Sequence, residues 1–132
     1  MSGDGFVEVR VRYPEVDRMG VAHHSHHFVW FEIGRTELMR SKDVDYRRLE
    51  DEEIFLPVVE ASCAYRAPAR YDDCLRVHTR IESSSGVRVS FSYRIERQAD
   101  ACLLATGNTR HAAVDRSGRP CRLPGTIRGL LA

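Results

Sequence analysis

The sequence lacks the features that mark several other classes of protein. No stretch approaches the roughly 18 consecutive apolar residues of a membrane-spanning helix. The N-terminus has no basic region followed by an apolar one, so no secretion signal is expected and a cytoplasmic protein is predicted. The net charge is only +1, which argues against a general binder of nucleic acid or another polyanion. Neither a membrane nor a nucleic-acid partner is therefore expected.

Cysteine is present, but not in the spacing of a metal or redox motif. The four cysteines are widely separated and no Cys-x-x-Cys pair occurs, so neither a zinc ribbon nor a thioredoxin-like site is indicated. Without a secretion signal, free thiols are expected rather than disulfides. The four positions are Cys63, Cys74, Cys102 and Cys121.

The length and the composition fit one domain. The chain has 132 residues, of which 42% are hydrophobic and 30% are charged, and this is enough for a single core. No internal repeat or low-complexity tract interrupts it. We therefore interpret residues 1–132 as one domain.

Hydrophobic periodicity in the first half predicts a strand followed by a long helix. Apolar and polar residues alternate over 7–13, which is the period of a half-buried strand, and Pro14 should end that strand. A helix is predicted from about Ser25 to Arg40. Gly34 lies inside it and costs about 1 kcal/mol relative to alanine, so close packing is expected there. A short polar helix or turn is expected over 45–52.

The second half is predicted to form strands separated by turns. The order of strand, long helix and then four strands in a meander predicts an α+β architecture in which an antiparallel sheet packs on one helix. Such a sheet covers only one side of the apolar helix, so a second subunit is expected on the remainder. The predicted strands are 54–65, 75–82, 87–96 and 102–115, with turns at 83–86, 98–100 and 115–118 and a short helical tail at 124–131.

One segment combines an acid with the start of this helix. Asp17 lies eight residues before the predicted helix start, and Gly20 between them allows a tight backbone path. The partial positive charge and free N–H groups of a helix N-terminus keep a nearby carboxylate ionised. Such a carboxylate can act as a general base or attack a carbonyl carbon itself, while oriented N–H groups stabilise the oxyanion. An ordinary turn or capping role is the alternative for a lone aspartate.

The same segment resembles a family signature. Its pattern is Tyr-x-x-x-Asp-x-x-Gly-Val over 13–21, then His-His at 23–24 and Trp-Phe-Glu-x-Gly-Arg-x-Glu over 30–37. This is similar to the hot-dog-fold acyl-CoA thioesterases, in particular the 4-hydroxybenzoyl-CoA thioesterase family. The likeness continues through nearly the whole chain. The further matches are Phe-Leu-Pro-Val-Val-Glu at 55–60, Arg-Ala-Pro-Ala at 66–69, Tyr-Asp-Asp at 71–73, Thr-Arg-His at 109–111 and Arg-Pro-Cys-Arg-Leu-Pro at 119–124.

The resemblance implies a hot-dog fold and an acyl-CoA thioesterase that needs neither a cofactor nor a metal. Asp17 matches the catalytic aspartate of the family, as general base or as nucleophile. His24 matches the position whose backbone N–H polarises the thioester carbonyl, with a direct role of its imidazole as the alternative. His27 stands where the family commonly has an aromatic residue beside the acyl group.

The resemblance also implies a homodimer or homotetramer with active sites at the subunit boundary. Asp17 is expected to face the partner's strand near Val59 and Glu60, which become candidate substrate-binding residues. The basic run that binds CoA phosphates in some members is replaced here by Ser-Ser-Ser-Gly at 83–86. Arg88 is then a candidate for the phosphates, although a solvated strand face is the alternative.

Several alternatives stay open at this point. The histidines over 23–27 have spacings compatible with a metal site, but no second ligand group stands out elsewhere. Glu32 is the rival catalytic acid, and if buried in a structural ion pair it has no such role. Trp30 and Phe31 are expected in the core, with a place in the acyl pocket as the alternative. A thioesterase acting on a carrier-protein-bound chain, or a non-catalytic acyl-CoA-binding domain, would also fit the pattern.

Overall fold

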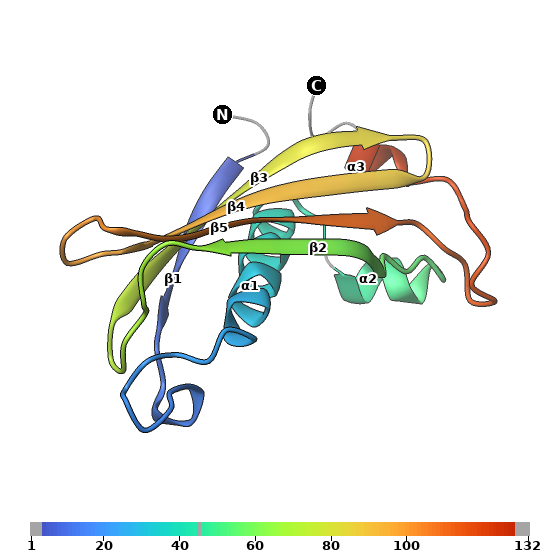
Figure 1. Cartoon of the computed structure of the whole chain (residues 1–132). Coiled ribbons are helices and arrows are strands. Elements are labelled where there is room, and N and C mark those ends of the chain that lie inside the picture. The colour runs from blue at the N-terminus through green and yellow to red at the C-terminus, as the bar shows by residue number, and fades with distance from the viewer. Residues whose placement is uncertain (1–3, 45, 129–132) are drawn as a thin grey trace.

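One long helix lies against one face of a five-stranded antiparallel sheet (Figure 1). This computed structural model describes residues 4–44 and 46–128. The predicted α+β class is confirmed. The helix α1 spans His26–Ser41, and the strands are β1 (Asp4–Arg10), β2 (Val58–Tyr65), β3 (Cys74–Ser85), β4 (Arg88–Arg97) and β5 (Leu103–Ala112). The shorter elements are the 3₁₀ turn η1 (Tyr13–Glu15), α2 (Tyr46–Asp51) and α3 (Gly125–Arg128).

The sheet has the strand order β1-β3-β4-β5-β2, so β1 and β2 form its two edges. β2 pairs with β5 and not with β3, which follows it in the sequence. The predicted four-strand meander is therefore wrong, because only β3, β4 and β5 are neighbours in chain order. Periodicity could not reveal this, since it specifies which face of a strand is buried and not which strand lies beside it.

The core lies between α1 and the inner face of the sheet. Trp30 and Phe31 of α1 are 1% and 0% exposed, which confirms their predicted place in the core. Apolar residues alternate with polar ones along β4 and point to the same core, as a period of two requires. The buried residues of β4 are Val89, Phe91, Tyr93 and Ile95.

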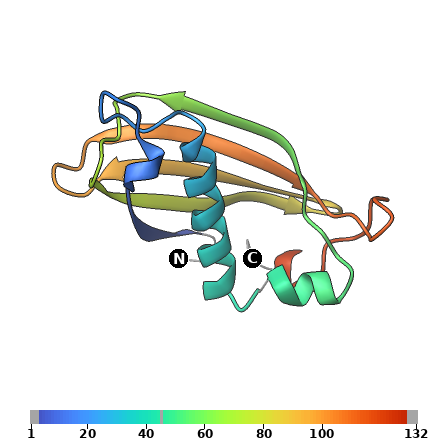
Figure 2. The same cartoon turned by 90° about the horizontal axis from the view of Figure 1, so that it is seen from below.

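The helix crosses the face of the sheet, and α2 lies near its C-terminal end (Figure 2). The approach is closest at Gly34, where an added Cβ would meet Thr79 and Val77 of β3. The close packing predicted from a glycine inside a helix is confirmed. Within the described residues, no helix is both long enough and apolar enough to cross a membrane.

Several predicted boundaries differ from the structure. β1 ends at Arg10, before the predicted end, and Pro14 lies in η1. β3 continues through Ser85 because Ser83 and Ser84 still pair with β4, so the turn predicted at 83–86 begins later. Asp45 and the predicted helical residues 129–131 lie outside the described residues.

Two predictions about side chains can also be compared with the structure. The structural ion pair considered for Glu32 is present: its carboxylate lies 3.5 Å from the guanidinium of Arg35. Arg35 is the buried partner, whereas the Glu32 side chain is 67% exposed. The four cysteines are free thiols, as predicted.

Candidate active site

The loop that precedes α1 is organised around Asp17. Its Oδ1 accepts hydrogen bonds from the N–H groups of Met19 at 2.8 Å and Val21 at 3.2 Å. Gly20 lies between them with a φ of 76°, in the left-handed region that favours glycine, as the tight backbone path predicted there requires. Asp17 is exposed, and no described residue forms a hydrogen bond or ion pair with its Oδ2. One carboxylate oxygen thus holds the loop, and the other has no polar partner among the described residues.

This loop is fixed to the connection between β2 and β3. The N–H of Ala22 donates to the carbonyl of Ala69 at 2.8 Å, and the N–H of Tyr71 donates to that of Gly20 at 3.1 Å. Val21 also forms an isolated bridge with Arg70. The Asp17 loop therefore rests on segment 69–71 and has a defined position relative to the helix start.

The start of α1 leaves a backbone donor free. Ser25 is the N-cap residue, and no side chain caps it. Among residues 4–44 and 46–128, the N–H of His24 has no hydrogen-bond acceptor. An unpaired N–H beside a helix start favours a developing negative charge, because the N-terminus of a helix carries a partial positive charge. The sequence placed an oxyanion donor at this residue.

A pocket of about 310 Å³ opens beside this donor. It lies between the start of α1 and the end of β2, and apolar groups form most of its wall. Its walls include Val21, Ala22, His24, His27, Tyr65 and Pro68. Asp17 does not line it within one chain.

His27 is buried in the wall of this pocket, with 3% of its surface exposed. Its Nδ1 lies 3.1 Å from the carbonyl oxygen of His24, and a carbonyl only accepts, so Nδ1 carries the proton. Burial lowers the pKa of His27, so the ring is neutral at pH 7. The ring packs on Trp30 at 4.9 Å and edge-on against Tyr65 at 4.7 Å. The His27 ring thus packs between two aromatic rings in the wall of the pocket.

Tyr65 was missed by the sequence reasoning. It is the last residue of β2, and its hydroxyl donates a hydrogen bond of 2.9 Å to the carbonyl oxygen of His24, 41 residues earlier. The available signal was the alternation along β2, which puts Cys63 and Tyr65 on one face. That pattern gives no indication of which end of α1 the strand would reach, because β2 crosses to the far edge of the sheet.

The histidine cluster at the helix start is held by hydrogen bonds and ion pairs. His23 Nδ1 lies 2.8 Å from Ser25 Oγ, and His26 Nδ1 lies 3.9 Å from the buried carboxylate of Glu15. In the described part of the chain, no group of three or more His, Cys, Asp or Glu side chains is arranged around a common point that could hold a metal ion.

The remaining predicted site residues lie far from this pocket within one chain. Val59 and Glu60 are exposed at the start of β2, six residues or about 20 Å of strand from Tyr65. Glu60 forms an exposed ion pair with Arg110 at 3.4 Å. Arg88 begins β4 at the same end of the sheet, opposite Ala112. A single subunit therefore brings together His24 and His27, but not Val59, Glu60 or Arg88.

A second cavity, of about 320 Å³, lies along the seam between α1 and β2. Apolar side chains line most of it, and several are exposed: Val29 at 48% and Val58 at 45%, with Val59 beside them at 54%. The buried Arg35 reaches the same cavity next to Glu32. This seam is the exposed apolar side of the helix that the sequence predicts.

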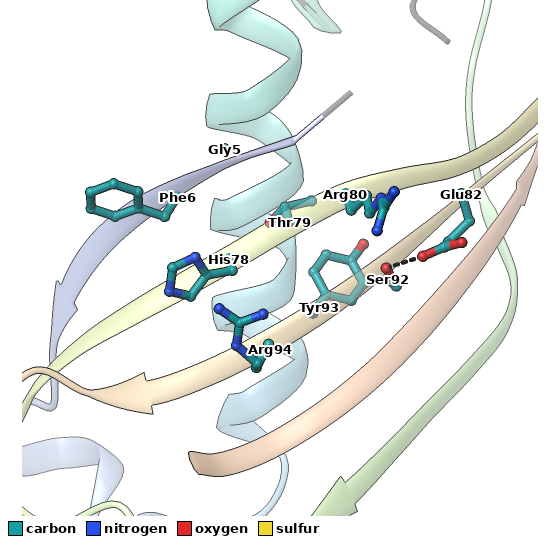
Figure 3. Close-up of a pocket in the computed structure, with 9 residues that line it drawn as sticks. All are labelled: Gly5, Phe6, His78, Thr79, Arg80, Glu82, Ser92, Tyr93 and Arg94. Carbon is teal, nitrogen blue, oxygen red and sulfur yellow. Dashed lines mark hydrogen bonds between the residues drawn. The ribbon is translucent and has the colours of Figure 1, made fainter. Parts of the chain in front are cut away.

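A further pocket, of about 490 Å³, lies on the opposite face of the sheet (Figure 3). Figure 3 shows Phe6, His78 and Arg94 side by side across β1, β3 and β4, with α1 behind the sheet. Two of its polar groups have partners on the sheet: His78 lies 2.9 Å from Glu96, and Glu82 accepts a hydrogen bond from a serine of β4. None of the predicted site residues lies in it, so it is a less suitable reaction site than the pocket beside His24.

Comparisons with known proteins place the chain in a family. Residues 11–131 match the thioesterase-like superfamily. The chain is 33% identical over 120 residues to the acyl-CoA thioester hydrolase YbgC of Escherichia coli O6:H1, covering 90% of this chain and 89% of that protein. It superposes on the crystal structure of the hypothetical protein TT1821 of Thermus thermophilus with a TM-score of 0.88 and 38% identity, covering 97% and 95% of the two chains.

A second similar structure is named after its substrate. It is a DHNA-CoA thioesterase of Staphylococcus aureus, with a TM-score of 0.87 and 28% identity, covering 91% of this chain and 80% of that one. Together with the five-stranded sheet on one long helix, these similarities confirm the predicted hot-dog fold.

Proposed function

The chain belongs to the thioesterase-like superfamily, and we propose that it hydrolyses acyl-CoA thioesters with Asp17 and the His24 backbone as its catalytic groups. Its relatives are named as acyl-CoA thioesterases, and the chain is an enzyme of this class. The observation that carries the proposal is the unpaired N–H of His24 at the helix start, next to a pocket and to a loop that leaves one Asp17 oxygen free.

In the proposed reaction, the thioester carbonyl oxygen accepts a hydrogen bond from the His24 N–H. Asp17 takes a proton from water while the water oxygen attacks the carbonyl carbon, and the oxyanion that forms is stabilised by the N–H and the helix dipole. Collapse of the tetrahedral intermediate breaks the C–S bond, and the proton passes to the CoA sulfur. The products are a carboxylate and free CoA.

Asp17 can also attack the carbonyl carbon directly. An Asp17 oxygen then forms a mixed anhydride as the C–S bond breaks, CoA leaves as the thiolate and takes a proton from solvent, and water hydrolyses the anhydride in a second step. The free Oδ2 supports either role, because Oδ1 is used by the loop. Both routes use the same oxyanion donor.

The proposed active site is shared between two subunits of a homodimer, which a homotetramer would double. β2 is paired on one side only, and the apolar seam beside it is exposed. A twofold, antiparallel pairing of two β2 strands would bring the start of each strand to the end of the other. The partner's Val59 and the partner's Glu60 would then lie near Tyr65 and the Asp17 loop, where they could contact substrate.

Substrate binding in this proposal uses groups from both subunits. His27 lies beside the acyl group, and Arg88, which is exposed, is the candidate for the CoA phosphates. The neutral ring of His27 fits an uncharged acyl chain or an aroyl group. A cytoplasmic location stays a prediction.

A panel of acyl-CoAs assayed for release of free thiol tests this function. Turnover of at least one short, medium or aroyl thioester is expected. Binding without turnover across the panel would favour a non-catalytic acyl-CoA-binding protein. Turnover of acyl-carrier-protein substrates alone would favour the carrier-protein alternative.

A further inference from the structure

The carbonyl of His24 has two hydrogen-bond donors in the structure. The Tyr65 hydroxyl donates to it at 2.9 Å from the end of β2, and His27 Nδ1 donates at 3.1 Å from within α1. The same residue supplies the unpaired N–H beside the pocket. The C=O group of His24 is thus fixed by two hydrogen bonds, while its N–H group stays free to bind a substrate oxygen.

We propose that Tyr65 is a positioning residue for thioester hydrolysis, because its hydroxyl fixes the peptide that supplies the oxyanion donor. This inference rests on the proposed function of His24. Two backbone torsions separate the N–H and C=O of one residue, so anchoring the carbonyl to a strand of the sheet restricts the direction of the N–H. A donor that is already oriented needs no reorganisation when charge develops on the substrate oxygen.

The surroundings of Tyr65 suit a permanent donor. Partial removal of the hydroxyl from water, with a smaller effect of the neighbouring Cys63 thiol, raises the pKa of Tyr65 to about 12. The hydroxyl therefore keeps its proton throughout the range in which a thioesterase works. The His27 ring packs edge-on against the Tyr65 ring at 4.7 Å, so each donor limits the motion of the other.

Tyr65 connects the start of the helix to a strand of the sheet. Tyr65 belongs to the edge strand β2, and the His24 peptide lies outside the hydrogen-bonding ladder of the sheet. Without the hydroxyl, the His24 carbonyl keeps only the hydrogen bond from His27, a residue of the same short stretch of chain. Among the described residues, the contact to Tyr65 is the hydrogen bond that joins His24 itself to a strand of the sheet.

The test is Tyr65→Phe, which removes the hydroxyl and keeps the ring. On the acyl-CoA that the enzyme hydrolyses fastest, kcat should fall by about 10- to 100-fold, less than the loss from removing an oxyanion donor itself, while KM rises by about fivefold at most. Tyr71→Phe is the matched control, since Tyr71 is exposed and no described residue hydrogen-bonds its hydroxyl. It should keep wild-type kinetics. Wild-type kcat in Tyr65→Phe would overturn the proposal.

Two CoA analogues separate positioning from general damage. One has a methylene group in place of the thioester sulfur and keeps the carbonyl oxygen, and the other is a thioether that lacks this oxygen. Tyr65→Phe should bind the carbonyl analogue about fivefold more weakly and the thioether as tightly as wild type does. Equal losses for both analogues would mean that Tyr65 only supports the fold, and would overturn the inference.

A readout that does not require activity keeps this proposal separate from the proposed function. Amide hydrogen exchange of His26 and Phe28, whose N–H groups form the first hydrogen bonds of α1, reports fraying of the helix start. Exchange at these amides should be faster in Tyr65→Phe than in Tyr71→Phe. Unchanged exchange in Tyr65→Phe would refute the anchor, even if the protein has no activity. Faster exchange in Tyr65→Phe, together with a wild type that hydrolyses no acyl-CoA, would count against the proposed function and not against the anchor.

Discussion

Gly34 of α1 and Thr79 of β3 are packed so closely that a Cβ on Gly34 would overlap the Thr79 hydroxyl. The same Cβ would lie 2.9 Å from Val77 Cγ1, closer than real side-chain contacts. β3 is held between β1 and β4, so it cannot move away from the helix without breaking the ladder on one side. The spacing between helix and sheet is therefore set at a residue without a side chain.

Gly34→Ala should lower the stability of the protein. Alanine is favoured over glycine in a helix by about 1 kcal/mol, but forcing an extra methyl group into a packed core costs about 1–3 kcal/mol. Overlap with a central strand makes the second effect the larger one. Thermal unfolding should show a lower Tm, and Thr79→Ala in the same chain should restore part of the loss. A higher Tm in Gly34→Ala would show that α1 can shift on the sheet.

Asp17→Asn should lower turnover by roughly two to four decades, the range for loss of a positioned base or nucleophile. The amide oxygen of asparagine can still accept from the N–H groups of Met19 and Val21, so the loop is kept while the charge is lost. Steady-state kinetics and circular dichroism together check this. Glu32→Gln is the control, because Glu32 is exposed on α1, and near-normal activity is expected there. The opposite outcome, an active Asp17→Asn and an inactive Glu32→Gln, would transfer the role to Glu32.

Acidification should destabilise the fold through His111. Its Nδ1 lies 3.0 Å from the Leu56 carbonyl and its Nε2 lies 2.9 Å from Thr109 Oγ1, and burial lowers the pKa of His111 from 6.5 to about 4. Between these two pH values the unfolded chain binds a proton that the folded chain does not. The contribution of His111 to stability is therefore complete above pH 6.5 and is lost as the pH drops towards 4. The free energy of unfolding decreases by about 3 kcal/mol over that window.

Urea unfolding at several pH values between 7.5 and 4.5 measures this effect. His111→Asn can retain the donor to Leu56 but does not titrate in this range, so its midpoint should vary less with pH than that of the wild type. In His23→Asn, a change at an exposed position, the urea midpoint should vary with pH as it does in the wild type. An identical slope in His111→Asn and wild type would assign the pH dependence to other groups, of which His27 is the first, since its pKa is also lowered.

Activity should not change on treatment with EDTA. The histidines at the helix start are engaged with Ser25 and with the Glu15 carboxylate, which leaves them poorly arranged to share a cation. Turnover measured before and after the chelator, with and without added Zn²⁺, checks this. Loss of turnover that Zn²⁺ restores would require a metal in the mechanism.

The sequence predicted the class of fold and the helix closely, and the reasons are local. The helix predicted from Ser25 to Arg40 is found at His26–Ser41, and the alternation along β4 gives its buried face correctly. These signals depend only on neighbours in sequence. Gly34 belongs with them, because a glycine inside a helix already implies a close neighbour on that face.

The parts that the sequence did not predict depend on distant pairing. The crossing of β2 to the far edge of the sheet is invisible to periodicity, and with it the contact of Tyr65 to His24. The ion pair of Glu32 was foreseen, but which of its two partners is buried depends on how α1 lies on the sheet, and Arg35 is the buried one. Asp17, His24, Val59 and Arg88 stay predictions as site residues.

The exposed edge of the sheet indicates that the chain assembles into an oligomer. The exposed apolar seam between α1 and β2, with Val29, Val58 and Val59, together with an unpaired strand edge, is more than a soluble monomer usually leaves open. We expect light scattering to give a dimer or a tetramer. A stable monomer of 15.1 kDa with full activity at working concentration would contradict this.

A complementation experiment then tests whether the active site is shared. Subunits with Asp17→Asn are mixed with subunits that carry a disabling change at Val59, after mild dissociation and reassociation. If Asp17 of one subunit works with the partner's Val59, each mixed dimer has one site with both lesions and one site with neither. With random pairing, about half of the dimers in an equal mixture are mixed, and one of the two sites in each is intact. If the sites are independent, we therefore expect recovery of about a quarter of wild-type activity. No recovery, with subunit exchange shown by mass-labelled chains, would mean that each site is built from a single chain, and the antiparallel pairing of β2 strands would lose its functional argument.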